Sequence, residues 1–224
     1  ALRFWRWTGA WDAASTTQGV GGTVAFVTAK SDPTSDKLMA TTVDAAQDLN
    51  TFYNAGAGSW ATAVEHDAST EPSATRGADF DWEPTGSKGL LVWGRWASKP
   101  ANYYRVYKTF TAPSWGSEVA TNTPSINHPW VQLRRNPRPV STDATKILGV
   151  WQDGTTANYP LGSLRWDGTT LTATGSAFTA TTGAFSAAEC FEIDFQNYMP
   201  ATVSVDPASK SIGSAGPITL LPIF

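Results

Sequence analysis

Three acidic residues alternate with aromatic ones in the segment ADFDWE, whose acids are Asp79, Asp81 and Glu83. On an extended strand this spacing places the three carboxylates on one face and the aromatic rings on the other. Carboxylates gathered in this way could ligate Ca²⁺ or Mg²⁺ through oxygen, or act as an acid and base pair. The alternative is that Arg134 lies between Asp81 and Asp194 and neutralises them in a buried polar network. We favour the buried network, with no cofactor beyond a possible structural Ca²⁺ or Mg²⁺.

A second segment repeats this alternation. CFEIDFQ, at residues 190–196, aligns Glu192 and Asp194 with the first two acids of ADFDWE. If the strands that carry these residues surround one axis, their side chains meet in a central channel. The predicted channel network consists of Asp79, Asp81, Glu83, Arg134, Glu192 and Asp194.

The 11 tryptophans are the second candidate for a functional role. Flat aromatic faces stack on sugar rings, and exposed aromatic groups mark interaction sites. Trp7, Trp60, Trp115 and Trp166 recur at similar positions of a repeat, which indicates packing in a core. The predicted binding surface therefore consists of the aromatic residues in or beside loops, namely Trp93, Trp96, Trp151, Tyr103, Tyr104 and Tyr159.

No catalytic constellation can be recognised. His66 and His128 lie in the segments HDAS and NHPW, which are typical of polar turns, and neither has a clustered partner. A hydrolase needs a base beside its nucleophile, and a metal site needs several ligands close together. Cys190 is the single cysteine and cannot pair within the chain, so we predict a buried thiol. We predict that the chain is not an enzyme.

The elements that must position these residues are strands. Thr, Ser, Ala and Gly are abundant, charged residues make up 16%, and no helical periodicity extends over a dozen residues. Asp-Gly pairs at 153–154 and 167–168 are flanked by alternating apolar residues, a strong signal for hairpins. The composition and these turns predict an all-β fold.

The strands repeat in units of four. Three units run over about residues 22–66, 78–120 and 129–176, and Trp60 and Trp115 of the first two are 55 residues apart. A fourth unit, at 190–207, has only two strands, and residues 1–15 could supply the other two. Four antiparallel strands in a repeat of this size are typical of a β-propeller blade. We predict one β-propeller domain over 1–224, with four blades, the last shared by the two ends of the chain, and a tail at 208–224.

With these units in view, the chain resembles the extracellular β-propeller repeat proteins of prokaryotes, in the sialidase-like group that bears Asp boxes. The residues that carry the resemblance are Arg165–Leu171 and Gln152–Thr156. The Asp-box pattern is Ser-x-Asp-x-Gly-x-x-Trp, whereas here Asp and Gly are adjacent and Leu171 stands in place of Trp. The resemblance implies a propeller and says little about activity, because one scaffold hosts many functions.

A sialidase-type active site does not transfer to this chain. It would need three arginines that grip a carboxylate, together with a Tyr and Glu nucleophile pair. Arg134, Arg135 and Arg138 all belong to one strand and its turn, so they do not match arginines from separate blades. A sialidase-like glycoside hydrolase is therefore the least favoured of the functions that we consider.

Charge and composition restrict the remaining functions. The net charge of −3 and the pI of about 5.3 argue against a nucleic-acid partner, and no apolar run has the length of a membrane span. Low Lys and abundant Thr, Ser and Gly predict an extracellular or cell-surface location for a mature product or a fragment. We expect a non-catalytic structural or adhesive module that binds copies of itself or surface proteins, with assembly into a filament. The alternative is a glycan-binding, lectin-like propeller.

Overall fold

The computed structural model describes most of the chain, and all of its regular elements are strands. The described residues are 2–13, 16–56, 58, 60–70, 76–98, 102–121, 130–137, 145–152, 161–173, 191–196, 199–204 and 219–222. None of them belongs to a helix, so the part of the chain that is described contains no helix that could cross a membrane. The predicted all-β class is confirmed.

The strands form a series of antiparallel sheets. The first sheet contains β3 (Val24–Ser31), β4 (Leu38–Asp44), β5 (Leu49–Asn54) and β6 (Val64–Asp67). The second contains β7 (Ala78–Trp82), β8 (Lys88–Ser98), β9 (Asn102–Thr111), β10 (Ser114–Trp115) and β11 (Val119–Thr121). The third contains β12 (Val131–Arg135), β13 (Ile147–Gln152), β14 (Leu161–Trp166) and β15 (Leu171–Ala173). The fourth contains β16 (Phe191–Gln196), β17 (Met199–Ser204) and β18 (Thr219–Pro222).

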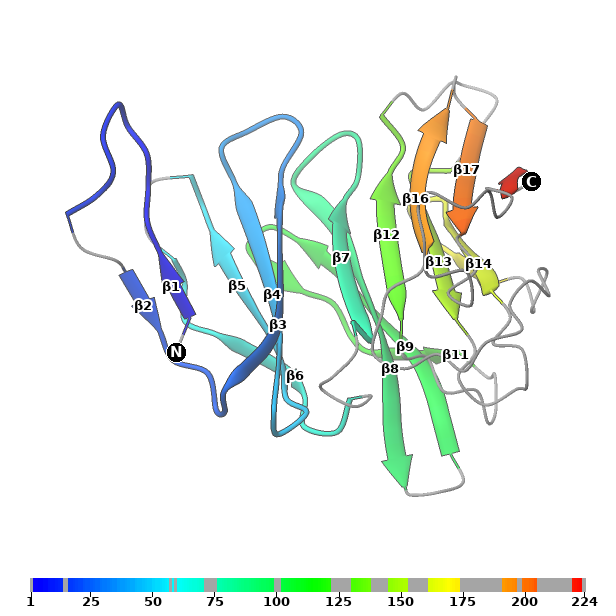
Figure 1. Cartoon of the computed structure of the whole chain (residues 1–224), viewed down its shortest axis with the longest axis horizontal. Helices are drawn as coiled ribbons and strands as arrows, with labels where there is room; N and C mark the ends of the chain where they lie inside the picture. Colours follow the sequence, from blue (N-terminus) through cyan, green and yellow to red (C-terminus); the bar gives the residue numbers. More distant parts are fainter. Residues whose placement is uncertain are drawn as a thin grey trace, which may run out of the picture.

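Consecutive sheets meet at their opening strands. Figure 1 shows β3, β7, β12 and β16 following one another across the molecule, and each contacts the next. Each of these strands is an edge strand of its own sheet, since only its other side pairs with the second strand of that sheet. The free edges of neighbouring sheets therefore face each other along the line where the sheets meet.

The core lies between the sheets as separate apolar layers. Strand β8 contributes to two of them, because Leu91 and Trp93 pack towards the first sheet while Leu90 and Val92 pack towards the third. This alternation follows from the two faces of a strand. A third layer contains Trp130, Leu148, Val150, Leu161 and Ile193. Burial on both faces explains why β13, with the sequence ILGVWQ, is buried at every position.

The ends of the chain pair differently from the prediction that residues 1–15 complete the last sheet. Strand β17 pairs with β18, which lies within the predicted tail, and β1 (Leu2–Phe4) pairs with β2 (Thr16–Gln18). The ring of Phe4 stacks on Trp60 with a centroid distance of 3.9 Å. The apolar segment TLLP thus supplies the third strand of the fourth sheet, while aromatic stacking fixes the N-terminal segment against the first sheet.

His66 lies on β6 and not in a polar turn, which corrects the reading of HDAS. Its side chain is buried, its Nε2 is 2.8 Å from Thr51 Oγ1, and its ring meets Trp115 edge to face at 4.5 Å. Burial lowers the pKa of His66 to about 3, and the charge of Lys108 acts in the same direction. The imidazole is therefore neutral in the folded protein at physiological pH. His128 and Cys190 lie outside the described residues.

The stability of the fold should depend on pH through His66. The unfolded chain takes up a proton on this residue below about pH 6.5, whereas the folded chain does so only near pH 3. Stability is therefore lost as the pH falls through this window. Between pH 7 and pH 5 we expect His66 to account for a loss of about 2 kcal/mol in the free energy of unfolding.

Urea denaturation of the wild type and of His66→Gln at both pH values measures this contribution. Gln keeps a polar partner for Thr51 but does not titrate, so the variant should lose about 2 kcal/mol less than the wild type on acidification. Equal losses in the two proteins would contradict a buried neutral histidine.

Candidate functional site

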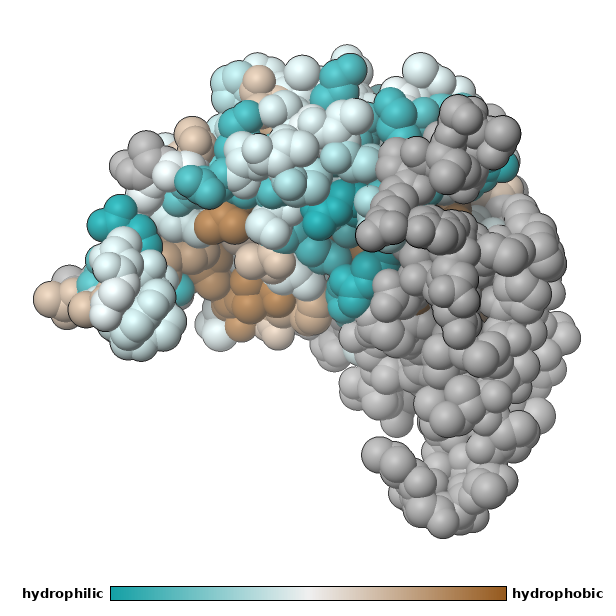
Figure 2. Space-filling model, turned by 90° about the horizontal axis from the view of Figure 1, so that it is seen from above, coloured by the Kyte–Doolittle hydropathy of each residue, from teal (hydrophilic) through white to brown (hydrophobic). Residues whose placement is uncertain are grey.

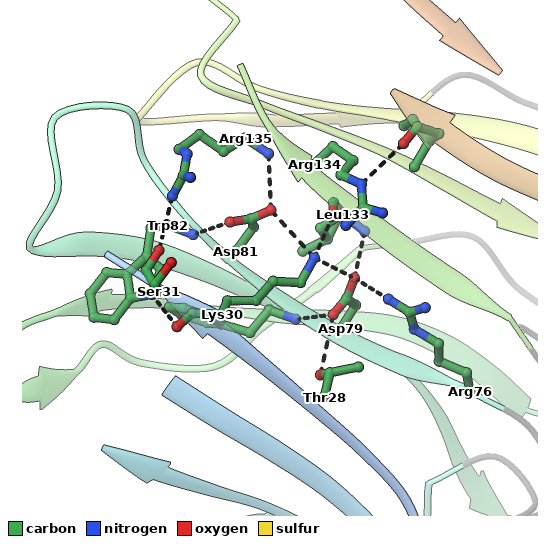
Figure 3. A network of polar contacts seen from close by, with 12 residues as sticks. Thr28, Lys30, Ser31, Arg76, Asp79, Asp81, Trp82, Leu133, Arg134 and Arg135 are labelled. Atoms are coloured by element: carbon green, nitrogen blue, oxygen red, sulfur yellow. Dashed lines mark hydrogen bonds and ion pairs between the residues drawn. The ribbon is translucent and has the colours of Figure 1, made fainter. Parts of the chain in front are cut away.

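The acidic row on β7 lies where the free edges of β7 and β12 face each other. Asp79, Asp81 and Glu83 are buried, as expected for side chains directed to the inside of the molecule. Figure 3 shows the first two of them between the backbone of β12 and the side chain of Lys30. The site therefore draws on three sheets, since Lys30 belongs to β3 of the first sheet.

The two aspartates connect the edges of β7 and β12 in the same way. One oxygen of Asp79 accepts the main-chain N–H of Phe80 on its own strand at 3.0 Å, and the other accepts that of Leu133 at 2.8 Å. Asp81 repeats this pattern, with Trp82 at 2.8 Å and Arg135 at 3.0 Å. Each carboxylate thus satisfies one N–H from each of two edge strands that would otherwise lack an acceptor.

Lys30 supplies the positive charge of this network. Its Nζ atom lies 3.7 Å from Asp79 and 3.6 Å from Asp81, and it donates to the carbonyl oxygen of Leu133 at 3.2 Å. Arg76 adds a second ion pair with Asp79, at 2.8 Å. Burial raises the pKa of Asp81, and the charge of Asp79 adds to this effect, while Lys30 opposes it. Among the contributions that lower the pKa of Asp81, the charge of Lys30 is the largest, and the main-chain N–H groups of Trp82 and Arg135 act in the same direction.

The third acid, Glu83, joins the second sheet to the third through side chains. Its two carboxylate oxygens accept hydrogen bonds from the indole N–H of Trp166 and from Lys146 Nζ, both at 3.0 Å. Asp32 has the corresponding place at the end of β3, where it accepts the N–H of Ser87 at 2.7 Å. Burial opposes ionisation of Asp32, but hydrogen bonds from Ser87 and Thr34 outweigh it and lower the pKa. An acid at the end of an opening strand thus binds the next sheet in both cases.

The predicted neutralising residue, Arg134, has a different described contact. Its Nε donates to the carbonyl oxygen of Ile193 on β16, at 3.1 Å, and so connects the third and fourth sheets. The described cations on Asp79 and Asp81 are instead Lys30 and Arg76. The side chains of Glu192 and Asp194 lie outside the described residues. A buried polar network thus surrounds Asp79 and Asp81 on β7, and a lysine from the first sheet lies at its centre where Arg134 was predicted.

The residues around Asp79 and Asp81 do not suit Ca²⁺ or Mg²⁺. A divalent cation would need several oxygen ligands converging on one point. Here the carboxylate oxygens accept main-chain N–H groups, and the ammonium of Lys30 lies between them. Among the described residues, no three His, Cys, Asp or Glu side chains are grouped so that they could hold a metal ion.

The predicted aromatic surface needs correction. Trp93 and Trp151 are both 0% exposed, because β8 and β13 are covered on both faces. Trp93 donates its indole N–H to Asp67 at 2.7 Å, and the guanidinium of Arg105 lies over the ring of Trp151 at 4.6 Å. The side chains of Trp96, Tyr103 and Tyr104, and the whole of Tyr159, lie outside the described residues.

The four tryptophans predicted for the core also divide. Trp166 is buried, and Trp60 and Trp115 are partly buried. Trp7 is 58% exposed. Its neighbours Trp5 and Trp11 are also exposed, at 51% and 67%. Repetition at similar positions therefore identified a packing role for three of them, while the N-terminal copy presents its ring to solvent.

Lys30 could have been found in the sequence by aligning the first two units. The segments KSDPT at 30–34 and DWEPT at 81–85 match at their Pro-Thr pair, which places Lys30 opposite Asp81 and Asp32 opposite Glu83. Residues at the same position of adjacent opening strands lie side by side in the structure. Alignment of the first two units thus pairs a lysine with an aspartate. Comparison of the two acidic segments, ADFDWE and CFEIDFQ, does not include the lysine and therefore cannot identify this pair.

Replacing Lys30 by Met should destabilise the fold strongly. The substitution keeps an unbranched side chain but leaves two buried carboxylates without their shared cation, at a cost of about 3–5 kcal/mol. The loss should be smaller at pH 4 than at pH 7, because protonation then removes the uncompensated charge. Chemical denaturation at the two pH values measures both effects.

The matched control is Lys88→Met, since Lys88 is exposed on β8. It should change the free energy of unfolding by no more than about 0.5 kcal/mol. A Lys30→Met penalty as small as that of the control would show that Asp79 and Asp81 do not depend on the lysine.

Comparisons with known proteins were made with the complete chain. No protein-family model matches it. No curated protein is similar to it either.

Proposed function

We propose that the chain is a non-catalytic structural or adhesive module of the extracellular space or the cell surface. The observation that carries this proposal is that Asp79, Asp81 and Glu83 are engaged in hydrogen bonds within the protein. Both oxygens of Asp79 and both oxygens of Asp81 accept main-chain hydrogen bonds, and both oxygens of Glu83 accept side-chain ones. Carboxylates engaged in this way join sheets, because every one of their oxygens already accepts a hydrogen bond from a protein group.

The module is a β-propeller in this proposal, and its sheets are the blades. Three features support this architecture. The sheets are antiparallel and consecutive in the chain, their opening strands contact one another in order, and apolar layers separate them. A propeller arranges such sheets around an axis with the opening strands innermost. In this proposal the four sheets are the four blades, and the N-terminal segment is stacked on the first of them.

Assembly with other copies is the form of adhesion that the first sheet supports best. Strand β3 alternates between partly buried and exposed side chains, and its exposed face carries Ala25, Val27 and Ala29. In Figure 2, apolar surface gathers over the first sheet next to the N-terminal segment at the left. Surface of this kind beside an edge strand favours contact with another chain.

A structural role for Asp81 predicts a loss of stability on substitution by Asn. The amide offers one acceptor oxygen, so either Trp82 or Arg135 loses the partner of its main-chain N–H. We expect the free energy of unfolding to fall by about 1–3 kcal/mol, as measured by urea denaturation. The control Glu65→Gln, at an exposed position of β6, should be nearly neutral. An Asp81→Asn variant as stable as the control would remove the main support for the structural proposal.

Self-assembly predicts a native mass above that of one chain. Light scattering should give multiples of 23.9 kDa, and negative-stain images should show a regular axial repeat. Val27→Lys places a charge on the exposed face of β3 and should reduce the assemblies to single chains. Val119→Lys, at a similarly exposed valine of β11, serves as the control. A wild type that remains at 23.9 kDa over the accessible concentration range would rule out the filament form.

A further inference from the structure

The N-terminal segment forms a small hairpin that presents tryptophans. The N–H of Asp12 donates to the carbonyl oxygen of Arg6 at 3.0 Å, and the N–H of Thr8 donates to that of Ala10 at 3.1 Å. Gly9 occupies the turn with a φ of +95°, a conformation that favours glycine. Trp7 and Trp11 pair across the hairpin, with their rings edge to face at 5.3 Å. The hairpin is thus an ordered support for side chains that are not buried in it.

Exposure of this kind is unusual for tryptophan. Trp5, Trp7 and Trp11 are each more than half exposed, and they lie within seven residues of one another. Large aromatic side chains dominate the energetics of cores and interfaces because of the area that they bury. A cluster of solvent-exposed aromatic side chains therefore marks a surface that binds a ligand or another molecule.

A cavity of about 600 Å³ lies beside this hairpin. It is lined on one side by Phe4, Trp5 and Trp7, and on the other by residues of the first sheet that include Trp60 and Asn54. Its volume falls within the roughly 300–1,000 Å³ of small-molecule sites. Its walls combine aromatic faces with a few polar groups, which is the composition of such sites.

The loop after β5 shapes the cavity by coming very close to the hairpin. Gly56 and Gly58 both have positive φ values, of +94° and +81°. A Cβ atom on Gly58 would lie 2.6 Å from Arg6 Nη1, so the absence of a side chain lets the guanidinium cross this loop. Gly58 thereby leaves room for Arg6 at the cavity, while the neighbours Trp5 and Trp7 remain exposed.

The lining favours an uncharged ligand that is rich in hydroxyl groups. Arg6 pairs with Asp12 at 3.8 Å, and Asp36 adds one further carboxylate, so the cavity has no excess of positive charge for an anion. Guanidinium, carboxylate and amide groups together offer both donors and acceptors to hydroxyl groups. A pyranose ring with equatorial hydroxyls carries axial C–H groups on its faces, and such an apolar face packs well on a flat indole.

We propose that this cavity binds a neutral oligosaccharide of β-linked, equatorially hydroxylated pyranose rings, held on Trp5 and Trp7. The site is separate from the acidic row on β7 and is independent of the structural role proposed for that row. It also differs from the aromatic surface predicted from the sequence, since none of the residues predicted there lines it.

The test is a titration with cellohexaose, chitohexaose and xylohexaose, followed by tryptophan fluorescence and by calorimetry. At least one of the three should bind saturably with a stoichiometry of one site per chain and shift the tryptophan emission. Trp7→Ala and Trp5→Ala should each weaken that binding at least about thirtyfold, as expected for an aromatic anchor. Trp7→Phe keeps a flat ring and should retain most of the affinity.

Two controls show whether a loss of binding is specific to the cavity. Val119→Ala, an exposed apolar residue on β11, should bind as the wild type does. Thermal unfolding of each variant should match the wild type, because Trp5 and Trp7 are mostly exposed. The proposal is overturned if none of the three hexasaccharides binds, or if the Trp5 and Trp7 variants bind as tightly as the wild type. The self-assembly face of β3 shares Ala29 with the cavity, so the titration is made on single chains. Absence of self-assembly or of the Asp81 effect does not remove the cavity, so the two proposals can fail separately.

Discussion

The fold depends on how hydrogen-bond donors are satisfied where two sheet edges meet. Strands β7 and β12 run beside each other without forming a common ladder, so their outward N–H groups need acceptors from elsewhere. Asp79 and Asp81 provide them, one oxygen for each strand. Water could accept hydrogen bonds from these N–H groups only if β7 and β12 moved apart. The apolar layers on either side of the two strands would then lose their packing. The two carboxylates therefore help to fix the position of the second sheet against the third, together with Glu83 and the shared apolar layer.

That arrangement buries the carboxylates of Asp79 and Asp81, and the first sheet supplies the positive charge that compensates them. Lys30 reaches both aspartates from β3, and the carbonyl oxygen of the same residue accepts the indole N–H of Trp82 at 2.9 Å. One lysine thus contacts the second sheet through its side chain and its backbone. Because a buried ion pair gains little over apolar packing, its main contribution is specificity of arrangement. The acids fit only beside a strand that presents a cation at the matching position.

Much of the fold could be predicted from the sequence, but less of the site. Alternation in ADFDWE correctly placed three carboxylates on one buried face, and the pair Asp167-Gly168 forms the turn between β14 and β15 as expected. The identity of the cation depends on which strand lies beside β7, and this is a long-range property that Lys30 alone does not reveal. Trp93 and Trp151 were misplaced because a strand buried on both faces has no polar side, so alternation does not distinguish its inner and outer residues. The cavity was missed because it arises from two glycines with positive φ and a hairpin far away in the chain.

The charges of the opening strands also bear on how such a chain could lengthen by duplication. Lys30 on β3, Asp81 on β7 and Arg134 on β12 occupy matching places and alternate in sign. Insertion of a single copied unit would set two acids or two bases side by side and leave one of them without a counterion. Insertion of a unit together with its neighbour would preserve the alternation. At the boundary where Lys30 pairs with Asp81, duplication of two neighbouring units together is therefore more compatible with the charges than duplication of one.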